Sequence, residues 1–205
     1  MSRRTVEVMS SDLRPGPDSP PTDELASAEA ALSALQHVLH PIARDELSKS
    51  TPCSEYDVLQ LTDHLLNSIT QLGGAAGADL PDRNTDYSVE EQVVGAARPA
   101  LDAWHRRGLD DTVTLGPNEL PATSAVSILT LELLVHGWDY GAATRRPINV
   151  AESLADYALG LAKKVINPQT RATVGFDDPV AVPDDAPALD RLIAFTGRDP
   201  AVARA

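Results

Sequence analysis

One carboxylate in a long apolar stretch constrains the fold of this chain more than any other feature. From Ala122 to Gly137 the sequence carries a single carboxylate, Glu132, and no lysine or arginine. Burying an ionised carboxylate is costly unless a partner or a metal ion compensates its charge. The partner on the same segment is His136, whose side chain four residues later projects from the same face of a helix. The stretch therefore predicts a buried helix whose charge must be held in place.

The composition indicates the class of protein to which this helix belongs. The chain has 205 residues, 42% of them hydrophobic, which is enough for one domain with a sizeable core. Its formal net charge of -13 argues against nucleic acid and anionic membrane surfaces as partners. No apolar run approaches the ~20 residues of a membrane-spanning helix, and the single cysteine, Cys53, fits a reducing compartment. We therefore expect a cytoplasmic protein with no nucleic-acid or membrane partner.

The first 21 residues differ in composition from the rest of the chain. Four prolines lie between Pro15 and Pro21, which predicts a flexible tail. The two arginines near the start are not followed by the apolar segment of a signal peptide. We therefore divide the chain into a flexible N-terminal tail, residues 1–21, and one helical domain, residues 22–205.

Apolar residues recur every three or four positions in five segments of the domain, which predicts five helices. A shorter helix is expected near residues 188–195, and residues 111–124 predict a loop or a short extended excursion around a Gly-Pro turn. Four long helices with short C-terminal additions predict an all-α protein, an antiparallel four-helix bundle. The five predicted helices are about Thr22–Leu47 with a break or kink at Pro41, Asp57–Leu72 ended by two glycines, Ser88–Arg107 opened by a capping box of Ser88 and Glu91, Ala122–Ala143 and Val150–Val165.

A histidine on another predicted helix completes a candidate metal site. His64 lies among leucines, beside the buried stripe of the second helix. Metal sites in helical bundles combine ligands from facing helices. Two imidazoles and one carboxylate are the ligand set of a catalytic zinc site whose fourth position is open to water or substrate. The spacing of Glu132 and His136 also allows a helix-surface contact or a buried ion pair, so the residues alone leave both interpretations open.

Three motifs carry a resemblance to a known family: TPCSEYDVLQLTDHLL at residues 51–66, ELLVHGWDYGAAT at 132–144 and FTGRDP at 195–200. From about Leu25 to Pro200 the chain resembles the DinB-like, mycothiol-dependent maleylpyruvate isomerase N-terminal family of actinobacterial metal-binding proteins. The resemblance implies a DinB-like metal-binding bundle with His64, Glu132 and His136 as the ligands of a divalent ion, zinc being the first expectation. It does not extend to the isomerase's second, C-terminal domain, which contributes to the substrate site of that enzyme.

The resemblance implies a metal that activates a low-molecular-weight thiol, mycothiol, for attack on a small electrophile. A coordinating thiol is held as thiolate at neutral pH, so the protein needs no cysteine nucleophile for an S-transferase or isomerase reaction. Two alternatives stay open. One is a non-catalytic metal- or ligand-binding module, in which a fourth protein ligand such as Asp139 or His37 completes the coordination of the metal. The other is a metal-assisted hydrolase. The expected partners are the small-molecule thiol and electrophile, and a homodimer is a further possibility.

Several other residues have more than one interpretation. Asp139 either accepts the second N–H of His136 or lies in water at the end of its helix. Cys53 either has a pKa lowered by the following helix N-terminus or is a small turn residue. Packing, capping or surface roles are expected for the remaining conspicuous residues, Trp138, His37, His40, His105, Arg106 and Arg107.

Overall fold

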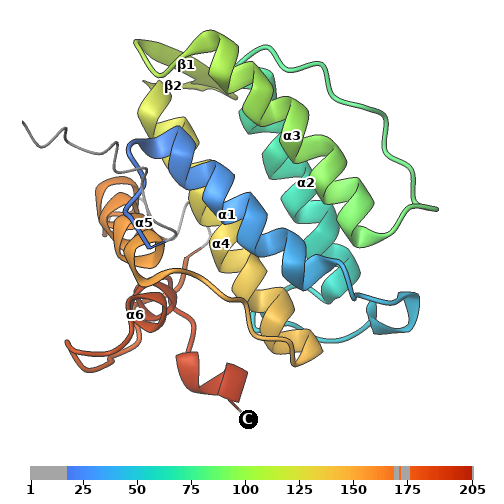
Figure 1. Ribbon diagram of the computed structural model, residues 1–205, viewed down its shortest axis with the longest axis vertical. Coiled ribbons are helices and arrows are strands. Elements are labelled where there is room, and N and C mark those ends of the chain that lie inside the picture. The colour runs from blue at the N-terminus through green and yellow to red at the C-terminus, as the bar shows by residue number, and fades with distance from the viewer. Residues whose placement is uncertain (1–17, 169–170, 172–175, 205) are drawn as a thin grey trace, which may run out of the picture.

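The computed structural model describes residues 18–168, 171 and 176–204, and the fold is mostly helical in these ranges (Figure 1). The predicted flexible tail lies largely outside them. Within the described ranges one pair of strands, β1 (Thr112–Leu115) and β2 (Asn118–Pro121), forms an antiparallel hairpin. The helices are α1 (Glu24–Leu39), α2 (Val58–Ala75), α3 (Val89–Arg107), α4 (Ala122–Thr144), α5 (Glu152–Val165) and α6 (Ala188–Phe195), with short 3-10 turns η1 (Arg44–Glu46) and η2 (Pro200–Arg204).

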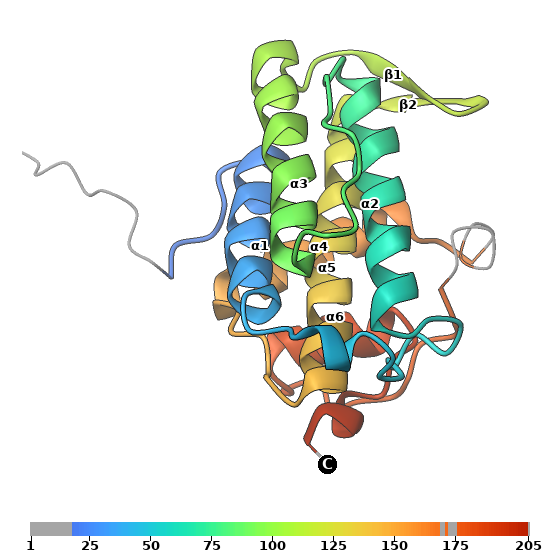
Figure 2. The ribbon, with the colours of Figure 1, turned by 90° about the vertical axis from the view of Figure 1, so that its right-hand side faces the viewer.

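The first four helices form a bundle in which α1 and α2 each pack against both α3 and α4 (Figure 2). The α1–α3 and α2–α4 neighbours are antiparallel, but α1 runs parallel to α4 and α2 runs parallel to α3. The prediction of an antiparallel arrangement is therefore wrong for two of the four neighbouring pairs. Consecutive helices that run parallel need a long connection, and residues 76–88 run back along the bundle between α2 and α3. The β1–β2 hairpin then joins α3 to α4, which runs in the opposite direction.

Helix α4 is the central element of the molecule. Seventeen of its 23 residues are buried, because α1 and α2 cover it within the bundle while α5 and η2 pack against it from outside. A helix that is apolar around its whole circumference requires such an environment. Close approach is possible because glycines replace larger residues: a Cβ at Gly137 would lie 2.7 Å from Cδ1 of Ile148, and one at Gly141 would lie 2.8 Å from the carbonyl oxygen of Arg146. The apolar stretch therefore is a buried helix, as predicted.

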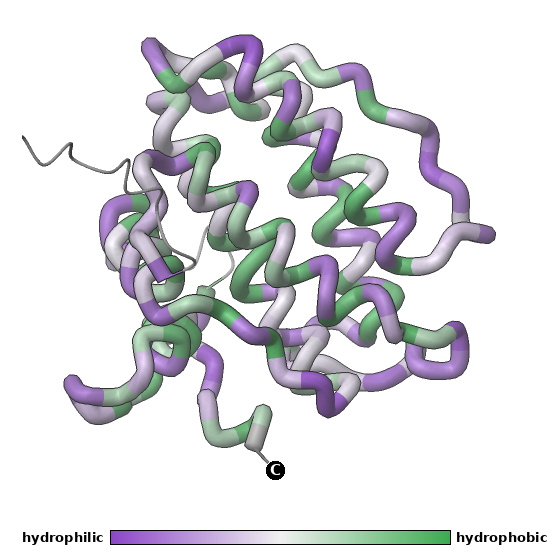
Figure 3. The backbone as a smooth tube through the Cα atoms, viewed as in Figure 1, coloured by the Kyte–Doolittle hydropathy of each residue, from purple (hydrophilic) through white to green (hydrophobic). Residues whose placement is uncertain are grey.

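Most helix boundaries follow local signals in the sequence. Helix α1 ends at Leu39, before Pro41, and α3 begins with the predicted capping box of Ser88 and Glu91. The predicted extended excursion around the Gly-Pro turn is the β1–β2 hairpin. Along α1, α2 and α3, hydrophobic and hydrophilic residues recur in turn, as in amphipathic helices (Figure 3).

One predicted boundary is wrong, because α2 continues through Gly73 and Gly74 to Ala75. A Cβ at Gly73 would lie 2.7 Å from the Cβ of Ala100, so this glycine permits close contact with α3. Tertiary packing here outweighs the weak helix propensity of glycine. In the described part of the chain no helix is both long and apolar enough to cross a membrane.

Candidate metal centre

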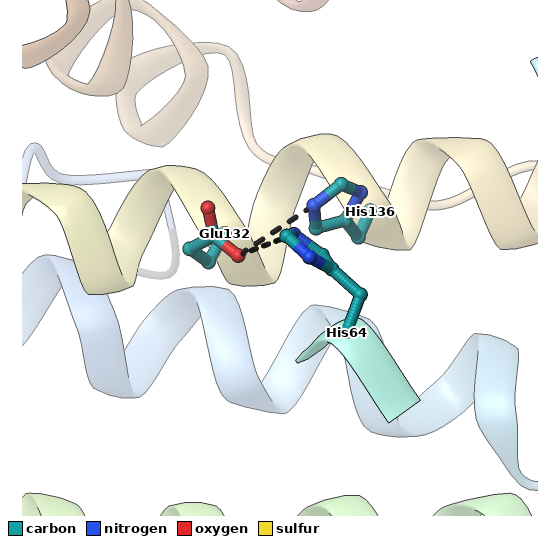
Figure 4. A group of neighbouring side chains, drawn as sticks. All are labelled: His64, Glu132 and His136. Atoms are coloured by element: carbon teal, nitrogen blue, oxygen red, sulfur yellow. Dashed lines mark ion pairs between the residues drawn. The ribbon is translucent and has the colours of Figure 1, made fainter. Parts of the chain in front are cut away.

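Three side chains from two antiparallel helices converge inside the bundle. His64 lies in the first half of α2, while Glu132 and His136 lie one turn apart on α4. Figure 4 shows the three side chains directed toward one another, with one carboxylate oxygen of Glu132 facing both imidazole rings. One ligand atom from each residue lies within 4.8 Å of the other two. Among the described residues this is the one group of three or more histidine, cysteine, aspartate or glutamate side chains close enough to hold a metal ion.

The separations in this cluster fit a shared ion better than direct hydrogen bonds. Oε2 of Glu132 lies 3.3 Å from Nε2 of His64 and 3.6 Å from Nε2 of His136. Charge-assisted hydrogen bonds are shorter, about 2.7–2.9 Å. By contrast, zinc bonds of roughly 2.0–2.2 Å in a tetrahedron separate neighbouring ligand atoms by about 3.4 Å. The three residues therefore have the chemistry and the spacing of a metal-binding set.

The carboxylate oxygen at the centre of the cluster lacks a hydrogen bond. Of the buried side-chain polar atoms in the described residues, only Oε2 of Glu132 and Oγ of Ser153 have no hydrogen-bond partner. Leaving a buried charged acceptor unsatisfied is costly, and buried unpaired groups are rare in native proteins. A cation bound between Glu132 and the two histidines would satisfy this oxygen.

The charges in the cluster compensate one another across the buried site. Burial raises the pKa of Glu132, but the neighbouring His136 and His64 outweigh it and hold that pKa well below its usual range. Burial lowers the pKa of His136, yet Asp139 and Glu132 together raise it to about 9. His136 must lose this proton before its Nε2 can bind a metal, because a ligating imidazole is neutral.

Asp139 orients His136 from the opposite side of the ring. Nδ1 of His136 donates a hydrogen bond to Oδ2 of Asp139 at 3.0 Å, which leaves Nε2 facing Glu132. Asp139 is fully buried, so the alternative of a carboxylate in water is wrong. Burial raises the pKa of Asp139, but His136 and Arg198 outweigh this effect and lower it.

Two residues at the site received no functional role from the sequence. Arg198 pairs with Asp139 at 3.1 Å from a segment 59 residues away, and its one sequence signal is the FTGRDP motif. The ring of Tyr56, which lies just before α2, stacks on His64 with centroids 5.1 Å apart and planes 24° apart. Tyr56 thereby restricts the His64 ring, the most exposed part of the cluster at 33%.

The other candidate residues lie outside the cluster. Cys53 is half-buried, and burial raises the pKa of its thiol against the effect of Arg198, so the interpretation of a lowered pKa is wrong. Trp138 is a core residue, as expected. Arg107 donates to three backbone carbonyls after α3, which is a structural role. The remaining histidines make contacts elsewhere: His37 with the Ser33 carbonyl, His40 with Glu90 and His105 with Glu29.

The fold and the site together define a helical bundle with a candidate centre of two histidines and one glutamate. Similar proteins are found in Mycobacterium tuberculosis: uncharacterized protein Rv0738 and uncharacterized protein MT0763, from two strains, are each 29% identical to this chain. Each similarity spans 179 residues, 86% of this chain and 98% of the relative. No family model matches the chain, and no solved structure matches it. The DinB-like assignment accordingly stays a prediction.

Proposed function

We propose that this protein is a DinB-like, divalent-metal-binding bundle that activates a low-molecular-weight thiol, mycothiol, for attack on a small electrophile. His64, Glu132 and His136 hold the ion, and zinc is the first expectation because two imidazoles and one carboxylate form a ligand set of catalytic zinc sites. When bound, the ion supplies Lewis acidity and stabilises the thiolate form of the cosubstrate. The proposal joins the resemblance of the three sequence motifs to the geometry of the site.

The observation that carries the proposal is the environment of Oε2 of Glu132. This oxygen is buried, has no hydrogen bond, and lies 3.3 and 3.6 Å from two imidazole nitrogens. In a direct histidine–carboxylate ion pair, the nitrogen and oxygen atoms would lie closer together, at about 2.7–2.9 Å. The spacing supports a site whose three donor atoms share a cation.

Three features favour catalysis over a purely structural ion. No fourth side chain among the described residues joins the group of three. Asp139, an alternative fourth ligand, is occupied by His136 and Arg198, and His37 contacts the backbone of its own helix instead. A structural zinc site is closed by four protein ligands, whereas a catalytic one keeps a position for a substrate.

A cavity lined by Arg198 offers room for a small molecule. It has a volume of about 370 Å³, and Cys53, Glu55, Phe176 and Arg198 are among its lining residues. Arg198 connects it to the site through its ion pair with Asp139. A second cavity of about 370 Å³ lies between α1 and residues 146–154. None of the three cluster residues lines either cavity, but Arg198 lines the first and not the second. We therefore assign the substrate to the cavity that Arg198 lines.

Metal analysis and a thiol-transfer assay test the proposal together. Protein purified without a metal-chelating tag is expected to contain about one equivalent of metal ion per chain, as in a three-ligand zinc site, and to consume thiol in the presence of a reactive electrophile. His136→Ala should lose both properties, while the surface variant His40→Ala should retain both. Metal-dependent ester or amide hydrolysis without thiol consumption would favour the hydrolase alternative. Bound metal with neither activity would favour the binding module.

A further inference from the structure

Buried charges link the C-terminal segment of the chain to the candidate metal centre. Arg198 donates from Nε to Oδ1 of Asp139 at 3.2 Å and from Nη2 to Oδ2 at 3.1 Å. Asp139 accepts the hydrogen bond from Nδ1 of His136 at 3.0 Å. Arg198 is 9% exposed, His136 5% and Asp139 0%, so water competes little for these contacts. A continuous path of hydrogen bonds therefore runs from Arg198 to the ring of His136.

The end of helix α6 holds Arg198 in place. The backbone N–H of Gly197 donates to the carbonyl of Ala194, and that of Arg198 donates to the carbonyl of Ile193, as in a Schellman helix cap. Gly197 has a φ of 89°, and a Cβ there would lie 2.6 Å from the Cβ of Asp177. Nη1 of Arg198 also donates to the carbonyl of Thr196 at 3.2 Å. The cap and these contacts aim the guanidinium at Asp139.

We propose that Arg198 is a positioning residue of the metal centre and acts through Asp139. This inference rests on the proposed function, because it requires that His136 bind a metal. Hydrogen-bonding a ligating imidazole through its second nitrogen determines its tautomer and orientation. Asp139 can do so only if its own carboxylate is fixed, and the planar fork of an arginine holds both carboxylate oxygens at once. Arg198 thereby keeps Nε2 of His136 directed toward Glu132 and His64.

A double-mutant cycle on zinc affinity tests whether Arg198 acts through Asp139. Zinc dissociation constants would be measured by competition with a chromophoric chelator for the wild type, Asp139→Asn, Arg198→Met and the double variant. Each single substitution should weaken zinc binding about 10–100-fold. The double variant should bind zinc no more weakly than Asp139→Asn alone. Independent losses that add in the double variant would overturn the inference.

Arg171 provides a matched control for a general loss of stability. It is also 9% exposed and lies in the same region, but it donates to the backbone carbonyls of Asp177 and Phe195. Arg171→Met should lower the melting temperature and leave zinc affinity unchanged. Arg198→Lys, which keeps the charge and loses the fork, should restore part of the affinity lost in Arg198→Met. Equal weakening by Arg171→Met and Arg198→Met would show a folding defect and overturn the positioning role.

The visible absorption spectrum of the cobalt-substituted protein reports on the metal's ligands and does not depend on the stability of the fold. The wild type and Arg171→Met should share one visible spectrum, and Arg198→Met should shift it, because the His136 ligand changes orientation. If the wild type binds neither zinc nor cobalt, the proposed function fails and the inference with it. If the wild type binds both ions and Arg198→Met matches its affinity and spectrum, only the positioning role fails.

Discussion

Histidine–glutamate contacts occur in two regions of this molecule, and they differ in geometry. Two such pairs lie on the surface between α1 and α3. Nδ1 of His40 is 2.6 Å from Oε2 of Glu90, and Nε2 of His105 is 2.6 Å from Oε1 of Glu29. Between α2 and α4, Glu132 lies 3.3 and 3.6 Å from two histidines. The atoms of the surface pairs are within hydrogen-bond distance, whereas the buried Oε2 of Glu132 faces both rings and has a hydrogen bond to neither.

The difference shows that residue type alone does not identify a metal site. His105 and Glu29 are each about half exposed. Water therefore screens their attraction and hydrates the polar atoms that form no contact with the partner side chain. In the bundle interior, a carboxylate oxygen without a hydrogen bond is costly and rare, so such an oxygen indicates another partner, such as a metal ion. Burial and separation together distinguish the candidate ligands from ordinary ion pairs. The following predictions test that distinction.

The largest expected difference is in metal affinity. His136→Ala removes a ligand outright and should weaken zinc binding by more than the roughly 100-fold upper range for residues that only orient a ligand. His105→Ala removes a histidine of the same type from a surface pair and should leave zinc binding unchanged. Isothermal titration with zinc measures both. Equal affinities in the two variants would remove the distinction between the two regions.

Thermal stability should show the same contrast on a smaller scale. At a free zinc concentration about 100 times the dissociation constant, binding adds about 2.7 kcal/mol of stability. In a chain of this size that corresponds to a rise in melting temperature of roughly 5–10 °C. Glu132→Gln should lose most of this rise, because the charge that holds the ion is gone, while Glu29→Gln should show the full rise. Scanning calorimetry with and without zinc makes the measurement, and a zinc-insensitive wild type would contradict it.

The carboxylate of Glu46 sharpens the comparison through its pH dependence. Glu46 is only 10% exposed but is fully satisfied, by Lys49 at 2.7 Å and Arg146 at 2.9 Å. Hydrogen bonds from Lys49 and Arg146 lower the pKa of Glu46 to about 2, from 4.5. A lowered folded-state pKa means that the stabilisation is complete above the unfolded-state value and disappears as the pH falls from about 4.5 toward 2.

Glu46→Gln should therefore melt below the wild type near neutral pH, and the gap should narrow in acid. Melting curves of both proteins at pH 7, 4.5 and 3 would follow this convergence. The metal-free proteins should be used, so that loss of zinc in acid does not enter the comparison. A gap that stays constant down to pH 3 would show that the charge of Glu46 contributes nothing to stability.

The smallest effect is expected at the surface pairs themselves. Glu29→Gln should change the free energy of unfolding by no more than about 0.5 kcal/mol, because exposed ion pairs are screened and cost side-chain entropy to form. Urea unfolding at low and moderate salt would measure the change. A loss of unfolding free energy above about 2 kcal/mol, as for a buried hydrogen-bond network, would show that this surface pair contributes as much as a buried one.

Local spacing accounts for the parts of this structure that the sequence predicts. The capping box of Ser88, the break before Pro41 and the pairing of Glu132 with His136 each depend on residues a few positions apart. Helix geometry determines such neighbours before any tertiary contact forms. His64 was predicted from its place beside an apolar stripe and from the family resemblance, and the structure confirms that it meets the other two residues.

The directions of the helices, the burial of Asp139 and the partnership of Arg198 have no such local origin. Parallel neighbours depend on how the long 76–88 connection and the hairpin run. The guanidinium that pairs with Asp139 comes from 59 residues away and reaches it only because α6 ends in a Schellman cap beside α4. A sequence specifies which residues share one helix face, whereas contacts between distant segments depend on the packing of the whole core.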